Sequence, residues 1–343
     1  MHTVIRFCTM LLVLGLVSCK PKPKENAVYI QNTGRALGTS FKIKYEHPEG
    51  EDIMNDIISL LDKFEDVMSV YRPHSIVSRI NRNDPDVVPD EHFTLIFNKA
   101  RQVYEATDGL YDVTVAPLVN AWGFGFEKKI DMPSTKIDSL LVFVGMNKVR
   151  IKDGKFIKDD PRIMLDFNSI AKGCAVDVVA NLLESRHIKN YMVEIGGEIH
   201  AKGINNHGKI WTIQIDKPFD GNVIPGMFPQ AYLRLKGRSM ATSGEYRRYY
   251  KEGGKKYSHT MDPRTGYPVS DTTLLSVTIL AGDCMTADAW ATACMVSGTK
   301  GAIKLLEKHP ELDAYIIYSD VNGKHKSYMT KGVKDNLIAE AGK

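Results

Sequence analysis

The stretch at residues 239–270, SMATSGEYRRYYKEGGKKYSHTMDPRTGYPVS, concentrates polar and charged side chains in a short span. It holds two neighbouring hydroxyls, Thr242 and Ser243, one histidine, His259, and a run of lysines and arginines with tyrosines between them. A hydrophobic core has no use for so many hydrogen-bonding groups, because each must find a partner when buried. The stretch therefore predicts a site for a phosphorylated ligand that carries an aromatic ring.

A simpler interpretation competes with this one for each part of the stretch. Residues 262–266, Asp-Pro-Arg-Thr-Gly, have the composition of a tight turn, since proline fixes φ and glycine accepts positive φ. Taken alone, such a turn is more often structural than catalytic. His259, however, precedes Asp262 closely, and an imidazole with a pKa of roughly 6.5 suits proton transfer near neutral pH. We expect His259 to carry a proton in catalysis, with Asp262 beside it.

Several segments together resemble the ApbE family, the FAD:protein FMN transferases. The first two are Ala-Thr-Ser-Gly at 241–244 and Ser-His-Thr-Met-Asp-Pro-Arg-Thr-Gly-Tyr-Pro at 258–268. The others are Pro-Leu-Val-Asn and Trp-Gly-Phe-Gly within 109–125, Asp-x-x-x-Ile-Ala-Lys-Gly at 166–173 and Ala-Asp-Ala-x-x-Thr at 287–292. The resemblance extends, in order, from about residue 34 to residue 319. For Trp122 and Phe124, packing in the hydrophobic core is the better interpretation.

Two segments suggest where phosphate and metal bind. Residues 164–173 read as a strand that enters a helix through a small-residue loop, and free N–H groups at a helix start favour an anion. Asp288 and Thr292 lie four residues apart, on one face of a predicted helix at 287–297. Hard oxygen ligands of this kind suit Mg²⁺. The alternative for Asp288 is an N-terminal cap shared with Thr286.

The resemblance implies a reaction in which FMN passes from FAD to a threonine or serine hydroxyl of an acceptor protein, with release of AMP. It implies that Mg²⁺ is held by Ser169, Ala171, Asp288 and Thr292. It further implies contacts with FAD from Leu37, Tyr71, Leu110, Tyr111, Asp112, Asp166, Lys172, Ser243, His259 and Met261. One alternative is an Mg²⁺-dependent FAD pyrophosphatase that uses water as the acceptor. A less favoured alternative is a non-catalytic flavin-binding lipoprotein.

The pattern of apolar residues predicts an α+β fold with mixed sheets and flanking helices, and the resemblance makes it ApbE-like and T-fold-related. Residues 40–45 alternate as a strand does, while the apolar positions of 51–68 follow a helical stripe. Cys174, Cys284 and Cys294 lie among small apolar residues, which predicts packed thiols rather than disulfides. We expect one transferase domain at 29–335.

The amino-terminal residues predict export and lipidation. Residues 1–18 read as a lipoprotein signal peptide, with Cys19 as the acylated residue and 19–28 as a lipidated tether. The alternative is an ordinary signal peptide with an incidental cysteine. We expect the cell envelope as the location, with a lipid anchor in a bacterial membrane facing the periplasm or exterior. The expected partners are exported acceptor flavoproteins such as membrane redox subunits.

No nucleic-acid partner is expected. The formal net charge is only +4, from 45 basic and 41 acidic residues, and the basic residues are dispersed along the chain.

Overall fold

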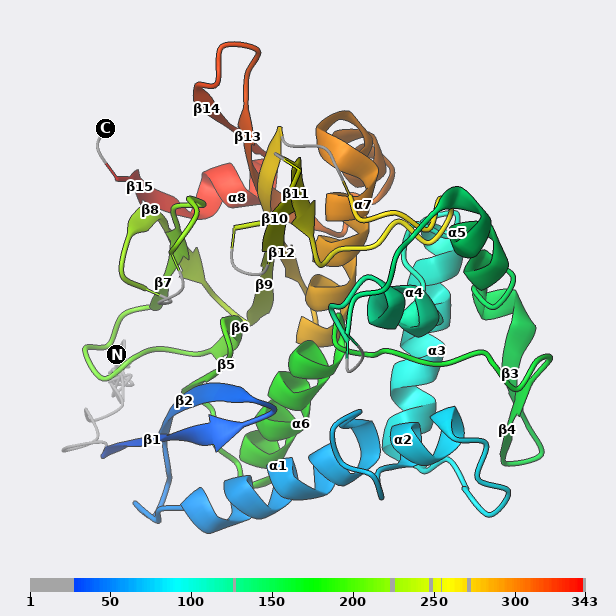
Figure 1. Ribbon diagram of the computed structural model, residues 1–343. Helices are drawn as coiled ribbons and strands as arrows, with labels where there is room; N and C mark the ends of the chain where they lie inside the picture. The colour runs from blue at the N-terminus through cyan, green and yellow to red at the C-terminus, as the bar shows by residue number, and fades with distance from the viewer. Residues whose placement is uncertain are drawn as a thin grey trace, which may run out of the picture.

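A central antiparallel sheet organises the protein, as the computed structural model shows for residues 28–125, 128–222, 226–246, 249–253, 255–269 and 273–341 (Figure 1). Every pair of neighbouring strands in this eight-stranded sheet is antiparallel. In sheet order the strands are β1 (Tyr29–Ala36), β2 (Thr39–Glu46), β5 (Tyr191–Ile195), β6 (Glu198–Lys202), β9 (Arg238–Gly244), β12 (Leu274–Ala281), β13 (Asp313–Ser319) and β14 (His325–Met329).

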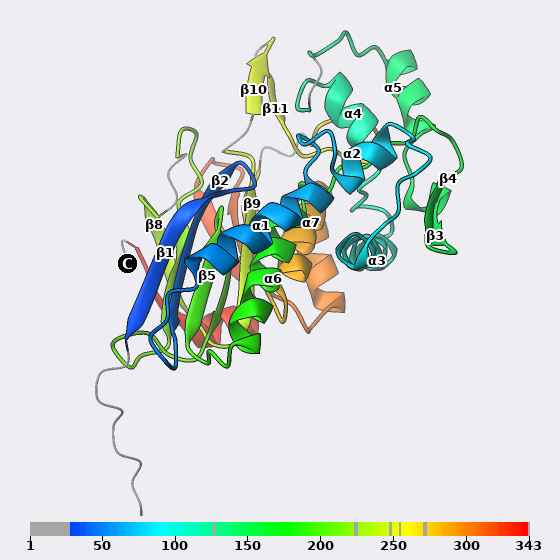
Figure 2. The same ribbon diagram turned by 90° about the horizontal axis from the view of Figure 1, so that it is seen from below.

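Helices cover one face of the central sheet (Figure 2). Those in contact with it or with one another are α1 (Met54–Met68), α3 (Glu91–Ala106), α6 (Ala171–Ser185) and α7 (Cys284–Lys308). On the side of these helices away from the sheet lie α2 (Ile76–Asn81), α4 (Ala116–Ala121), α5 (Ser134–Leu141), η1 (Met146–Lys148) and the hairpin β3 (Val149–Lys152) with β4 (Lys155–Lys158). Alternate residues of β2, Phe41, Ile43 and Tyr45, point into the core beneath the helices.

A smaller sheet covers part of the opposite face. Its elements are β7 (Trp211–Asp216), β8 (Pro229–Leu235) and β15 (Leu337–Glu340), accompanied by α8 (Lys331–Asn336). A second core lies here, with Met240 and Leu280 from the central sheet among its members. Because β12 is covered on both faces, its residues are buried almost without alternation. A separate hairpin, β10 (Tyr249–Glu252) with β11 (Lys255–Ser258), projects from the body of the protein.

The α+β class is confirmed, and most predicted elements occur within three residues of their expected bounds. Three expectations were wrong. Met164 forms only an isolated bridge to Val115 instead of a strand. The helix expected from 287 begins at Cys284, and Asp283 rather than Thr286 caps it, because its carboxylate accepts the N–H of Thr286. The helix predicted to end at residue 297 continues to Lys308, with a kink at Gly298, whose φ is 68°.

The elements after residue 319, β14, α8 and β15, were not predicted. The domain limits of 29–335 remain a prediction. The predicted signal peptide, Cys19 and nearly all of the tether lie outside the described residues.

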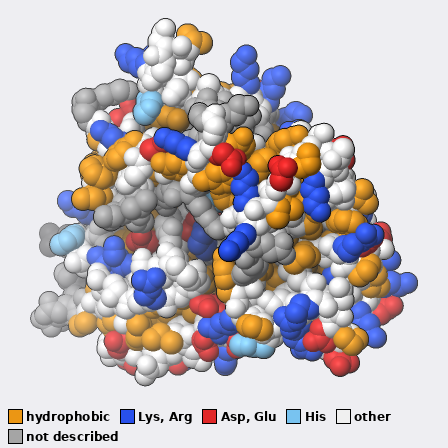
Figure 3. Space-filling model, viewed as in Figure 1, with side chains coloured by type: hydrophobic (Ala, Val, Ile, Leu, Met, Phe, Trp, Pro, Cys, Tyr) orange, Lys and Arg blue, Asp and Glu red, His pale blue; other side chains and the backbone are white. Residues whose placement is uncertain are grey.

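The cysteines and the basic side chains lie as the sequence predicts. Cys174, Cys284 and Cys294 are buried free thiols. Basic side chains are scattered among acidic and apolar ones over the face seen in Figure 3. Within the part of the chain that is described, no helix is long and apolar enough to cross a membrane.

Candidate functional site

A cavity of about 930 Å³ opens beside the ends of several elements. Its walls come from the β1–β2 turn, the end of α1, the start of α6, the β5–β6 turn, β9, the segment after β11, and α7. These segments are far apart in the sequence and meet only in the folded chain. Ten residues expected to hold substrate or metal line it: Leu37, Tyr71, Asp166, Ser169, Ala171, Lys172, Ser243, His259, Asp288 and Thr292.

A cluster of oxygen atoms lies where α6 and α7 touch. Asp288 is only 4% exposed, and its Oδ2 accepts the backbone N–H of Gly173 at 3.0 Å. Its Oδ1 lies 4.0 Å from the Nζ of Lys172, which is too long for a hydrogen bond. One helical turn later, the hydroxyl of Thr292 lies 3.4 Å from that of Ser243. A buried carboxylate with a weakly engaged oxygen, next to hydroxyl oxygens, has the donor chemistry that Mg²⁺ prefers.

An ion pair that sequence analysis missed lies beside this cluster. Lys172 Nζ is 2.5 Å from Oε1 of Glu198, whose Oε2 is buried and has no hydrogen-bond partner among the described residues. Burial raises the pKa of Glu198 to about 7, against the lowering effect of Lys172. Burial acts to lower the pKa of Lys172, but Asp288 and Glu198 outweigh it and hold that pKa above its ordinary value. Lys172 is therefore a fixed cation at neutral pH.

The only sequence signal for Glu198 is the glycine pair before it. Gly196 and Gly197 form the β5–β6 turn with φ values of 65° and 103°. A Cβ at Gly196 would lie 2.9 Å from a methyl carbon of Thr39 and 3.2 Å from Lys172 Cδ. The turn thus needs glycine so that the lysine can pass close to the backbone and reach Glu198.

His259 lines the cavity, but its expected companion Asp262 does not. The Asp262 carboxylate accepts the backbone N–H and two guanidinium hydrogen bonds of Arg264, all between 2.9 and 3.0 Å. It is therefore occupied within its own turn, as the simpler interpretation of residues 262–266 held. The same segment places Met261 in a small core with α4 and α5, and Met261 itself does not line the cavity.

Leu110, Tyr111 and Asp112 lie behind the cavity wall rather than on it. Tyr111 is 2% exposed, and its hydroxyl accepts a hydrogen bond from Ser169 Oγ at 3.1 Å. Asp112 accepts hydrogen bonds from Thr114 and from the N–H of Met146, and burial raises its pKa. In this structure the segment supports the wall through the contact of Tyr111 with Ser169, which lines the cavity.

The two aromatic rings expected in the core have different surroundings. Trp122 and Phe124 are both buried, at 5% and 6% exposure, but Phe124 also lines the cavity. Phe124 stacks on Tyr250, and Trp122 stacks on Tyr257, so both rings anchor the β10–β11 hairpin. Trp122 also donates its indole N–H to the carbonyl of Gly266 at 2.9 Å. The hairpin that leads to His259 is thus packed against α4.

Known proteins resemble this chain over nearly its whole length. A family model described as "ApbE family" matches residues 37–316, which include every residue that lines the cavity except Arg35. The FAD:protein FMN transferase of Vibrio cholerae is 37% identical, over 97% of this chain and 98% of its own length. The chain belongs to the ApbE family.

Other members of the ApbE family agree in sequence and in structure. The FAD:protein FMN transferase of Haemophilus influenzae is 37% identical over 91% of this chain and 92% of its own. The solved structure of the flavin transferase ApbE from Vibrio cholerae aligns with a TM-score of 0.80 at 35% identity, covering 91% of this chain and all of the other. The ApbE protein of Thermotoga maritima aligns with a TM-score of 0.78 at 29% identity, with the same coverage of both chains.

Proposed function

We propose that this ApbE-family chain is an FAD:protein FMN transferase. The observation that carries the proposal is the convergence of Asp166, Lys172, His259 and Asp288 on one cavity, from segments that are separate in the sequence. In the reaction, an acceptor hydroxyl forms a new P–O bond to the FMN phosphorus of FAD. The pyrophosphate bond breaks, AMP leaves, and the hydroxyl proton passes to a base.

His259 is the proposed base. It is the histidine that the cavity lining contains, and an imidazole can accept a hydroxyl proton near neutral pH. The carboxylate of Asp262 is engaged by Arg264, so the proposal no longer needs it as a catalytic group. Lys172, held charged by Glu198 and Asp288, lies where it would stabilise a phosphate oxygen.

Charge in the cavity supports a requirement for a divalent cation. Four carboxylates and three cations line the described wall, and the cations Arg72 and Lys172 already form ion pairs with carboxylates. The pyrophosphate of FAD would add two negative charges to this lining. Mg²⁺ held by Asp288 and Thr292, with oxygens from Ser169 and Ala171, would neutralise the pyrophosphate and position it for attack.

Mass spectrometry of the acceptor tests the transferase directly. The protein is incubated with FAD, Mg²⁺ and a candidate acceptor domain that carries a serine or threonine flavinylation site. An acceptor heavier by one FMN, lost with EDTA and in Asp288→Asn, is the expected result. His259→Ala should abolish transfer and still bind FAD, because it removes the base and leaves the rest of the lining. Full activity in that variant would rule out His259 as the base.

The hydrolase alternative uses the same cavity with water as the acceptor. It would be favoured if FMN and AMP accumulated while every acceptor tested stayed unmodified. A non-catalytic flavin-binding role would require FAD to stay intact with Mg²⁺ and acceptor present. We further propose that the acceptors are exported flavoproteins, including membrane redox subunits, and that a lipid on Cys19 anchors the protein in the cell envelope.

A further inference from the structure

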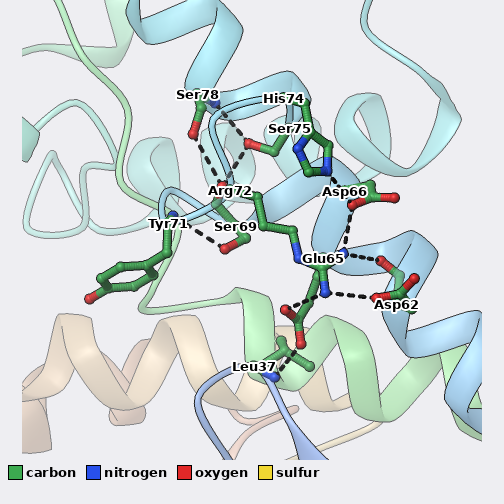
Figure 4. A network of polar contacts seen from close by, with 10 residues as sticks. All are labelled: Leu37, Asp62, Glu65, Asp66, Ser69, Tyr71, Arg72, His74, Ser75 and Ser78. Carbon is green, nitrogen blue, oxygen red and sulfur yellow. Dashed lines mark hydrogen bonds and ion pairs between the residues drawn. The ribbon is translucent and has the colours of Figure 1, made fainter.

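An ion-pair network at the end of α1 borders the cavity (Figure 4). At its centre, the guanidinium of Arg72 lies 2.7, 2.9 and 2.6 Å from carboxylate oxygens of Asp62, Glu65 and Asp66. Asp66 also accepts from His74 at 2.9 Å. These contacts raise the pKa of Arg72, with the hydrogen bonds to Asp66 and Asp62 as the main causes. Arg72 is thus held in place as a structural cation, although it lines the cavity.

Glu65 connects this network to the β1–β2 turn, which also lines the cavity. Its Oε1 accepts the backbone N–H of Leu37 at 2.6 Å, while its Oε2 faces Arg72. Leu37 and Gly38 form the two-residue β1–β2 turn with φ values of 50° and 71°. A turn with positive φ at both central residues favours Asn-Gly, and leucine there is strained. The hydrogen bond from outside the hairpin offsets that strain and fixes the direction of Leu37.

The same network fixes the loop that carries Tyr71. The N–H of Tyr71 donates to Ser69 Oγ at 3.2 Å. The Ser69 carbonyl accepts the hydroxyls of Ser75 at 2.6 Å and Ser78 at 3.2 Å. Arg72, the next residue after Tyr71, is tied to α1. In Figure 4 the Tyr71 ring extends away from these contacts, and it is 64% exposed while lining the cavity.

We propose that Glu65 and Arg72 are positioning residues for FAD, acting through Leu37 and Tyr71. One carboxylate holds both the Leu37 turn and the guanidinium of Arg72, so the two lining residues Leu37 and Tyr71 are fixed relative to each other. The inference rests on the proposed function, because Leu37 and Tyr71 are FAD contacts only under that proposal. The metal and phosphate residues lie on α7, on α6 and in the segment just before α6, outside this network. Disturbing the network should therefore weaken FAD binding more than it slows the chemical step.

The test compares three variants of the full chain: Glu65→Ala, Glu65→Gln and the control Asp56→Ala. Asp56 lies on the same helix and pairs with Arg186 at 2.6 Å, but it does not line the cavity. Kd for FAD is measured by flavin fluorescence, and KM and kcat by AMP release with Mg²⁺ and acceptor. Glu65→Ala should raise Kd and KM roughly tenfold, the factor for one charge-assisted hydrogen bond, with kcat changed less than about twofold.

Glu65→Gln supplies the decisive comparison, because its amide oxygen can still accept the Leu37 N–H while the charge is lost. Arg72 then retains Asp62 and Asp66, so Kd should rise by no more than about threefold. The inference is overturned if Glu65→Ala lowers kcat with Kd unchanged, or if Glu65→Gln is as impaired as Glu65→Ala. If Glu65→Ala does not fold, a tenfold rise in the Kd of Glu65→Gln for FAD also overturns the inference.

The wild-type protein separates the two proposals. If it binds FAD but neither transfers nor cleaves it, the proposed function fails and the Kd series still decides the positioning role. If it does not bind FAD, both are overturned.

Discussion

The substitution Gly173→Ala would test the packing of α6 against α7 on which the oxygen cluster depends. A Cβ built at Gly173 would lie 2.8 Å from the Cβ of Asp288 and 2.8 Å from the carbonyl carbon of Cys284, with its oxygen closer still. Real Cβ atoms do not approach so closely, and the obstacle is the main chain of α7, which no rotamer change can move. The two helices would therefore have to separate.

The expected magnitude combines two opposing effects. Overpacking a close contact costs roughly 1–3 kcal/mol, and a main-chain obstacle places this site near the upper end. Replacing glycine by alanine within a helix regains about 1 kcal/mol of helix propensity. The net loss should be about 2 kcal/mol, which lowers the unfolding midpoint of a domain of this size by roughly 3 °C. Because Gly173 also donates to Asp288, a shift of about 1 Å there should lower kcat by roughly 10²-fold.

The assay is thermal unfolding by circular dichroism together with Mg²⁺-dependent AMP release from FAD. Gly282→Ala is the matched control, since it precedes the same helix and a Cβ there would meet nothing within 4 Å. Its stability should stay within about 0.5 kcal/mol of the wild type. Wild-type stability and activity in Gly173→Ala would refute the geometry described for the α6–α7 contact.

Two further predictions concern buried carboxylates. Asp177 accepts the N–H groups of Cys284 and Met285 at 2.8 Å, and burial raises its pKa from 3.8 to about 7. Between pH 3.8 and about 7, the folded protein keeps a proton on Asp177 that the unfolded chain has released. The free energy of unfolding should therefore fall as the pH rises, by up to about 1.4 kcal/mol per pH unit in this range. Urea unfolding from pH 4 to 7 should show that slope, and Asp177→Asn should flatten it; an equal slope in both would exclude Asp177 as its source. Lys172→Met should destabilise by about 2 kcal/mol at pH 8, because Glu198 loses its partner, and by less at pH 6, where Glu198 can protonate. Adding Glu198→Gln should restore most of that stability, and no recovery in the double variant would contradict the pairing.

Local patterns in the sequence determined most of the helices and strands. They also determined which kinds of side chain the site contains. The strand expected at 40–45 occurs as β2, and the helical stripe at 51–68 occurs as α1. These elements depend on neighbours within a few residues, so the sequence reveals them directly. The motifs at 166–173 and 287–292 also pointed to residues that line the cavity, because each motif carries its functional side chains within one short segment.

The tertiary structure alone decided which of those side chains share a site and which are occupied elsewhere. It paired Glu198 with Lys172 and Glu65 with the turn at Leu37, and it kept Asp262 out of the cavity that His259 lines. The first two contacts join residues 26 and 28 positions apart. No periodic pattern encodes such pairs, because they arise only when sheet and helices pack. Burial then sets the energetic cost of leaving a carboxylate unpaired, and thereby its pKa.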